Sequence, residues 1–152
     1  MENLDADLQR RVWQRVQNRE KVEMPPLTRG NLRPGALVAL ENGAVYQNLS
    51  RRLPGREGEK LRKLWLDAEN TVACVKGLGR LQGEPLKLPQ LTPEKESAQR
   101  ALMKCCHRER KLWNEWEQLT ADGEYGPVYA QLARKARERC MVVLEVLGSL
   151  ER

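Results

Sequence analysis

The chain has 152 residues, 40% of them hydrophobic and 32% charged, with no phenylalanine and a formal net charge of +6. A chain of this length can bury the core of one domain without disulfides or metal ions, and its small share of β-forming residues favours helices over sheets. No apolar run approaches the roughly 20 residues that cross a bilayer, which argues against a membrane protein. The start, "MENLDADLQRRVWQRV", lacks the apolar stretch of a secretory signal, so we expect a cytoplasmic protein.

The excess of basic residues has an ordinary explanation. The 27 basic residues are spread along the expected helix faces with acidic residues nearby, as on solvated surfaces. No zinc-finger spacing, RNA-binding aromatic signature or clear helix-turn-helix pattern is present, which argues against nucleic acid as a partner. Binding of nucleic acid or an acidic partner through the basic faces is kept as the weakest alternative. The four cysteines include no Cys-x-x-Cys pair, so we expect free, partly buried thiols.

Residues 1–33 are expected to form a short helix and a proline-rich loop. Apolar residues recur at every fourth position from Leu4 to Val16, which predicts a helix over about 5–18. Prolines and a glycine in "EMPPLTRGNLRP" then interrupt the pattern. Trp13 lies on this short helix, which either docks on the rest of the protein or offers a surface to a second subunit or another protein.

Residues 34–152 are expected to form an all-α bundle of four long helices. The apolar spacing predicts these helices at about 34–53, 56–81, 93–121 and 128–147. Thr92 followed by Pro93 predicts the start of the third of them, because a hydroxyl N-cap precedes a proline in the first turn. Short breaks join the first two helices and the last two, so each pair should be an antiparallel hairpin.

The connection between the two hairpins is longer. Pro85 and Pro89 exclude regular helix over 82–92. Fully extended, this segment reaches roughly 36 Å, close to the roughly 38 Å of a helix of about 25 residues. It can therefore run the length of the bundle and start the second hairpin from the opposite end, which is the one-crossover arrangement of ferritin-like four-helix bundles.

The helix that contains Glu109 directs this carboxylate inward. Its apolar positions form a line with Glu109 in the middle: Leu102, Cys105, Cys106, Leu112, Trp113, Trp116 and Leu119. An ionised carboxylate in an apolar interior is costly unless a partner compensates it. His107, two residues before Glu109, should lie about 160° round the helix and face solvent.

Two stretches of the chain carry a resemblance to a known family. They are "GEYGPVYAQLARKARERC", preceded by "ERKLWNEWEQL", and "RRLPGREGEKLRKLWLDAENTVACVKGLGRLQGEP". The first is similar to the second hairpin of rubrerythrin-type ferritin-like proteins, particularly small versions from Gram-positive bacteria, and the other is similar to the junction and second helix of their first hairpin. The resemblance covers about residues 34–148. It implies a bundle that holds two iron ions through a Glu from one helix of each hairpin and a Glu-x-x-His from the other.

Most of the ligands implied by this resemblance are replaced in the present chain. Ala68 and Thr71 stand at the Glu-x-x-His positions of the first hairpin, and Ala136 and Arg139 at those of the second. Glu109 matches a family Glu, and Trp116, seven residues later, matches the family's aromatic residue.

The first long helix can be aligned with the family in two ways. Aligning Tyr46 with the family's tyrosine makes Ala39 the ligand position, whereas Glu41 is the alternative acid. The resemblance thus implies a degenerate di-iron site whose former metal-ligand positions are Ala39, Ala68, Thr71, Glu109, Ala136 and Arg139.

Arg139 is the expected partner of Glu109. A guanidinium at a former ligand position can replace part of the positive charge of the metal, which predicts a buried Glu109–Arg139 ion pair in place of iron. We therefore expect a non-catalytic bundle with a structural or interaction role and no metal or other cofactor, whose partner would be a second copy of the chain or another protein. The alternative is a rubrerythrin-like oxidoreductase that binds iron at an unconventional site drawn from Glu109, Glu41, Glu69, Cys74 and Cys140.

The remaining side chains of chemical interest have ordinary structural readings. The stretch Cys105–Cys106–His107 suggests a soft-metal site, but consecutive residues splay around a helix and rarely converge on one ion. Three tryptophans are expected in the core or at its edge: Trp65, Trp113 and Trp116. Tyr125 is expected in the turn that opens the last helix, and three acids are expected on solvated faces: Glu115, Glu117 and Glu145.

Overall fold

The computed structural model describes residues 27–151. The helix expected at 5–18, including Trp13, lies outside the described residues. The described part contains four helices and no β-strand: α2 (Arg33–Arg52), α3 (Gly55–Leu81), α4 (Ala98–Gln118) and α5 (Gly126–Leu150). An isolated bridge between Thr28 and Asn31 closes a short turn before α2. None of these helices is both long and apolar enough to cross a membrane.

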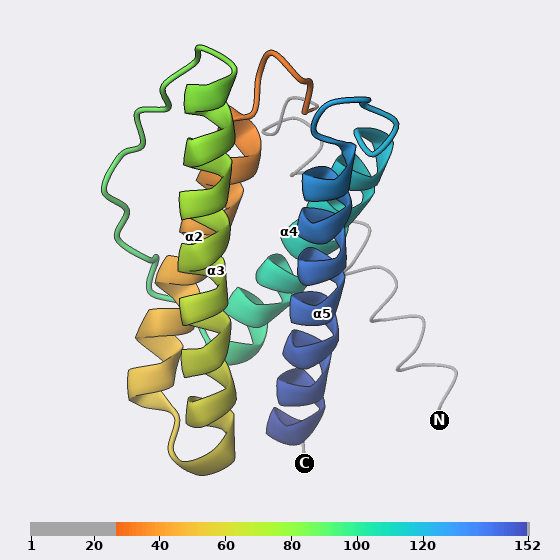
Figure 1. Cartoon of the computed structure of the whole chain (residues 1–152). Helices are drawn as coiled ribbons and strands as arrows, with labels where there is room; N and C mark the ends of the chain where they lie inside the picture. Colours follow the sequence, from red (N-terminus) through yellow and green to blue (C-terminus); the bar gives the residue numbers. More distant parts are fainter. Residues whose placement is uncertain (1–26, 152) are drawn as a thin grey trace.

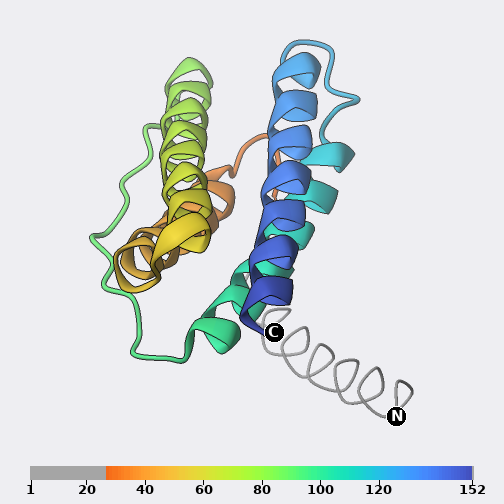
Figure 2. The same ribbon diagram turned by 90° about the horizontal axis from the view of Figure 1, so that it is seen from below.

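The helices form two antiparallel hairpins, α2 with α3 and α4 with α5 (Figure 1). The segment 82–97 leaves the end of α3 and runs back along the outside of the first hairpin, so that α4 begins at the opposite end of the bundle (Figure 1). Viewed from below, the two hairpins lie side by side, and α2 packs on α4 while α3 packs on α5 (Figure 2). The predicted bundle of two hairpins with one crossover is therefore observed.

The expected start of α4 at Pro93 is wrong by five residues. The helix begins at Ala98, and the side chain of Ser97 caps it by accepting a hydrogen bond from the backbone N–H of Arg100 at 3.3 Å. Residues 92–97 continue the crossover instead. This part of the crossover is fastened to α4, because the Lys104 ammonium forms ion pairs with the carboxylates of Glu94 and Glu96.

The other helix ends lie close to their expected positions, with one further difference at the end of α5. This helix continues through Gly148 to Leu150, although a glycine at that place predicted its end. A Cβ at position 148 would meet nothing within 4 Å, so neither packing nor a left-handed turn requires this glycine. The helix passes through it at a modest cost in backbone entropy.

Within residues 27–151 the core consists of two apolar clusters, one toward each end of the bundle. The first core lies around Trp116, which stacks on Tyr129 with ring centroids 5.9 Å apart. Gly35 allows α2 to approach this tryptophan, because a Cβ at position 35 would lie 2.7 Å from Trp116 Cζ2. The second core lies around Leu102 and Val143. On every helix, a buried polar residue lies between the segments that supply the two cores: Asn42, Thr71, Glu109 and Arg139.

Candidate functional site

A buried polar cluster joins all four described helices at the middle of the bundle. We refer to it as the central polar cluster, and it consists of Asn42 and Tyr46 from α2, Asp67 and Thr71 from α3, Glu109 from α4 and Arg139 from α5. Five of the six residues are buried, and Asp67, with 28% of its side chain exposed, connects the cluster to the surface.

The predicted ion pair between Glu109 and Arg139 is present. Nε of Arg139 lies 2.9 Å from Oε2 of Glu109, and the relative exposures of the two residues are 2% and 0%. The hydroxyl of Tyr46 donates a second hydrogen bond to the same oxygen, at 2.8 Å. One carboxylate oxygen of α4 is thus held by donors from α5 and α2, which couples the two hairpins.

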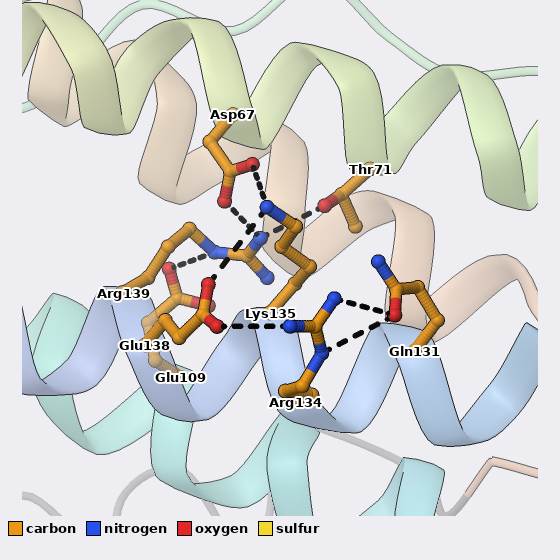
Figure 3. Close-up of polar contacts among 8 residues, drawn as sticks. All are labelled: Asp67, Thr71, Glu109, Gln131, Arg134, Lys135, Glu138 and Arg139. Carbon is orange, nitrogen blue, oxygen red and sulfur yellow. Dashed lines mark hydrogen bonds and ion pairs between the residues drawn. The ribbon is translucent and has the colours of Figure 1, made fainter.

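The other side of the guanidinium binds α3. Nη1 of Arg139 donates to Oδ2 of Asp67 and to Oγ1 of Thr71, each at 2.8 Å (Figure 3). Nζ of Lys135 lies 3.8 Å from the other oxygen of Asp67 (Figure 3). Two carboxylates are therefore matched by two cations, which makes a buried charge pair tolerable.

The ionisation states follow from these contacts. Burial, the largest influence, lowers the pKa of Arg139, but Glu109 and Asp67 outweigh it and raise this pKa above its ordinary value. Burial raises the pKa of Tyr46 well above its ordinary value, and the negative charge of Glu109 raises it further. Arg139 therefore stays charged and Tyr46 stays neutral at physiological pH, so both act as hydrogen-bond donors.

Three atoms of the cluster keep further hydrogen-bonding capacity. Oδ1 of Asn42, Oε1 of Glu109 and Nη2 of Arg139 are buried without a hydrogen-bond partner among the described residues. The amide nitrogen of Asn42 donates to the backbone oxygen of Cys105 at 3.3 Å. The cluster thus combines two spare acceptors with one spare donor.

All six positions predicted as former metal ligands are buried: Ala39, Ala68, Thr71, Glu109, Ala136 and Arg139. The structure brings three of them into direct contact, because Arg139 touches both Glu109 and Thr71. The three alanines contribute methyl groups, which have no atom that could bind a metal. Their derivation from an iron site stays a prediction.

The residues of the cluster do not fit a di-iron centre. Iron of this kind needs several oxygen and imidazole donors that converge on one point. Within residues 27–151, no group of three or more His, Cys, Asp or Glu residues is placed to hold a metal ion. Glu109 is the one fully buried acid of the cluster, and the guanidinium beside it would repel a metal cation.

The residues of the alternative iron site are not brought together either. Glu41 is half-buried, with a carboxylate oxygen 3.7 Å from Nε of Arg108. Glu69 is exposed and accepts a hydrogen bond from the indole of Trp65 at 3.1 Å, and Cys74 is also exposed. The soft-metal reading of Cys105, Cys106 and His107 fails on the same geometric test.

The expectation that His107 faces solvent is wrong. This residue is only 7% exposed. His107 lies about 160° round α4 from Glu109, and this angle does not depend on whether that face of α4 is covered. Burial, followed by the charges of Lys111, Arg110 and Arg108, lowers the pKa of His107 to about 4.

The expectation that Glu115 lies on a solvated face is also wrong, because this residue is half-buried. Its Oε2 accepts a hydrogen bond from the backbone N–H of Leu27 at 3.1 Å, which fastens the segment before α2 to α4. Glu117 and Glu145 are exposed, as predicted, and Tyr125 lies in the turn before α5, as predicted. Trp116 is buried and Trp65 and Trp113 are half-buried, which confirms their expected places.

Sequence reasoning missed Asp67 and Asn42 as members of the cluster and used Tyr46 only as an alignment marker. Asp67 lies four residues before Thr71, so the two side chains share one face of α3. This spacing was the available signal. None of the four cysteines forms a disulfide, as expected, and Cys74 is exposed while the other three are buried.

Comparison of the chain with family models, with curated proteins and with solved structures gave no match. Any function must therefore be argued from the central polar cluster and the topology that forms it.

Proposed function

We propose that the chain is a ferritin-like four-helix bundle in which the central polar cluster takes the place of a di-iron centre. In this proposal the protein is not an oxidoreductase and acts as a structural or interaction module. Two lines support it: the arrangement of two hairpins joined by one crossover, and the burial of all six positions that correspond to ligands in the resembling family.

The observation that carries the proposal is the guanidinium of Arg139 at the middle of the bundle. A guanidinium carries a permanent positive charge and only N–H donors, so it cannot bind a metal ion. Arg139 directs these donors to Glu109, Asp67 and Thr71, and so occupies the acids that could otherwise bind a cation. The positive charge at the centre of the bundle is thus a side-chain guanidinium.

A structural role also agrees with what the cluster connects. Arg139 of α5 contacts residues of both α3 and α4. Tyr46 connects α2 to the cluster because its hydroxyl binds Glu109. Buried ion pairs of this kind contribute little net stability but can fix how elements pair. As an interaction module, the bundle would bind a second copy of the chain or another protein, in the cytoplasm; light scattering of the purified chain distinguishes a monomer from a homodimer.

Metal analysis of protein purified from iron-supplemented cells tests the proposal. We expect the native chain to carry no stoichiometric iron, manganese or zinc, and stoichiometric metal would refute the proposal. A second variant tests the ligand register by restoring the family's ligand types with five substitutions: Ala39→Glu, Ala68→Glu, Thr71→His, Ala136→Glu and Arg139→His.

This five-substitution variant is expected to bind iron and to gain thermal stability when iron is added, because metal binding favours the folded state. Arg139→Met is the matched control, since it removes the central cation and adds neither a carboxylate nor an imidazole. A five-substitution variant that folds, judged by its helical circular dichroism, and ignores iron would contradict the ligand register and with it the ferritin-like assignment.

A further inference from the structure

Two buried thiols face each other across the interface of α4 and α5. Sγ of Cys106 lies 3.2 Å from Sγ of Cys140, and either thiol can donate a hydrogen bond to the other. Each sulfur also lies near the other residue's backbone oxygen: Cys106 Sγ is 3.9 Å from Cys140 O, and Cys140 Sγ is 3.6 Å from Cys106 O. The two contacts are reciprocal, as expected for two equivalent positions on antiparallel helices.

The central polar cluster fixes this approach. Cys106 lies one helical turn before Glu109, and Cys140 directly follows Arg139. The ion pair that joins α4 to α5 therefore also sets the register that brings the two sulfurs together. Of the other two cysteines, Cys74 is exposed and Cys105 is buried, and the sulfur–sulfur contact at 3.2 Å joins Cys106 to Cys140.

We infer that Cys106 and Cys140 form a reversible intramolecular disulfide, with a small hydroperoxide as the oxidant. A disulfide bond is about 2.05 Å long, so the sulfurs need to approach by only about 1.2 Å. The relative exposures of Cys106 and Cys140 are 2% and 6%. Because the two sulfurs are buried, only oxidants as small as hydrogen peroxide are expected to reach them, and bulky disulfide reagents are not. The inference involves no metal and no partner, so it is independent of the proposed function.

Cys140 is the sulfur that reacts first. When the Cys106 thiol donates the hydrogen bond, it lowers the pKa of Cys140, and the same bond raises the pKa of Cys106. The thiolate is the nucleophilic form of cysteine. Of the pair, Cys140 thus has both the more readily formed thiolate and the larger exposure.

The reaction is balanced in two steps. The Cys140 thiolate attacks one oxygen of hydrogen peroxide, the O–O bond breaks, and the departing hydroxide takes up the proton released by Cys140 to give water and a sulfenic acid. The sulfur of Cys106 then attacks the sulfenic sulfur, the S–O bond breaks, and the hydroxide leaves as water with the proton of Cys106. Two thiols are oxidised to one disulfide while one hydrogen peroxide is reduced to two waters.

The bond would join positions 34 residues apart and would lock α4 to α5. In the chain-entropy model, closing a loop of this length in the unfolded state raises the melting temperature of a protein of this size by about 10 °C. Reduction of the disulfide reverses the shift. A thermal difference between oxidised and reduced protein is therefore a readout separate from the chemical detection of the bond.

Hydrogen peroxide treatment of the folded full-length chain tests the inference. The background carries Cys74→Ser, which removes the exposed thiol and prevents disulfides between chains. After alkylation of the remaining thiols, non-reducing peptide mass spectrometry should show the Cys106–Cys140 link, and dithiothreitol should remove it. The melting temperature should rise on oxidation and return on reduction.

Two variants in this background serve as controls. Cys105→Ala should keep both the link and the thermal shift, because the sulfur that faces Cys106 Sγ at 3.2 Å is that of Cys140. Cys140→Ser should abolish both, and Cys106→Ser repeats the test if the first variant does not fold. The inference is overturned if both thiols survive excess peroxide in the folded chain, if Cys105 is linked instead, or if the bond forms only in denaturant.

Discussion

Removing one member of the Glu109–Arg139 pair should cost more stability than removing both. Arg139→Met leaves the Glu109 carboxylate fully buried with one hydrogen bond, from Tyr46, and no cation among the described residues within ion-pair distance. Breaking a buried pair in this way costs about 3–5 kcal/mol of unfolding free energy. It also removes the donors that bind Asp67 and Thr71.

Glu109→Leu should cost less than Arg139→Met, about 2–3 kcal/mol, because it removes one charge-assisted partner and leaves the guanidinium with others. Arg139 would still bind Asp67, which reaches solvent, and Thr71. The double variant Glu109→Leu with Arg139→Met exchanges the pair for two apolar side chains of similar size. Such exchanges are often neutral or stabilising. Here the hydroxyls of Tyr46 and Thr71 lose their partners, so we expect the free energy of unfolding to fall by about 2 kcal/mol.

Urea denaturation followed by circular dichroism measures these free energies, and an unchanged m-value checks that the comparison is valid. Arg134→Met is the matched control on the same helix, because its exposed pair with Glu138 at 3.5 Å should contribute less than about 0.5 kcal/mol. An unfolding free energy of Arg139→Met within about 1 kcal/mol of the native chain would contradict this prediction. A double variant less stable than the Arg139→Met single variant would contradict it equally.

The remaining predictions concern packing, protonation and a hydrogen bond. Gly58→Ala should lower the free energy of unfolding by about 2–3 kcal/mol, because its Cβ would lie 2.2 Å from a backbone oxygen of the preceding turn. Gly77→Ala has nothing within 4 Å of its Cβ and should instead raise this free energy by about 0.5–1 kcal/mol in the same urea assay. His107 has a pKa of about 4 in the folded protein against an ordinary value of 6.5, so the unfolded chain binds the proton more tightly in this window and stability should fall as pH drops from 6.5 to about 4. Thermal melts across this pH range should show a weaker dependence for His107→Gln, and an identical dependence would contradict the assignment. Tyr46→Phe should cost about 2 kcal/mol in urea, because it removes the hydroxyl that donates to the buried carboxylate at 2.8 Å; an unchanged midpoint would show that this hydrogen bond contributes nothing.

Much of the fold was predictable because each helix has a strong apolar period and the breaks contain proline or glycine. The Glu109–Arg139 pair was predictable for a related reason: both residues interrupt or flank an apolar line, and a buried charge requires an opposite one. The start of α4 was not predictable from local signals. Thr92 with Pro93 and Ser97 are both good helix starts, and the choice depends on how much chain the crossover needs to pass along the first hairpin.

The missed members of the cluster show a second limit. Asp67 lies beside the apolar line of α3 and reaches the cluster only through its side chain, while more than a quarter of that side chain stays exposed. Helical periodicity assigns such a residue to the surface. His107 shows the opposite error, because periodicity orients a residue on its own helix and does not tell what covers the far face.

The central polar cluster also explains why α4 and α5 pair in one register. The two cores on either side of it are apolar and tolerant, so a shift of α4 along α5 by a helical turn, about 5.4 Å, would still bury apolar surface. The same shift would move Glu109 away from Arg139 and Tyr46 and place an uncompensated carboxylate against aliphatic side chains. That penalty of several kcal/mol is absent from the native register. The cluster therefore selects one pairing of α4 with α5 even where it adds little to overall stability, and the approach of Cys106 to Cys140 depends on that selection.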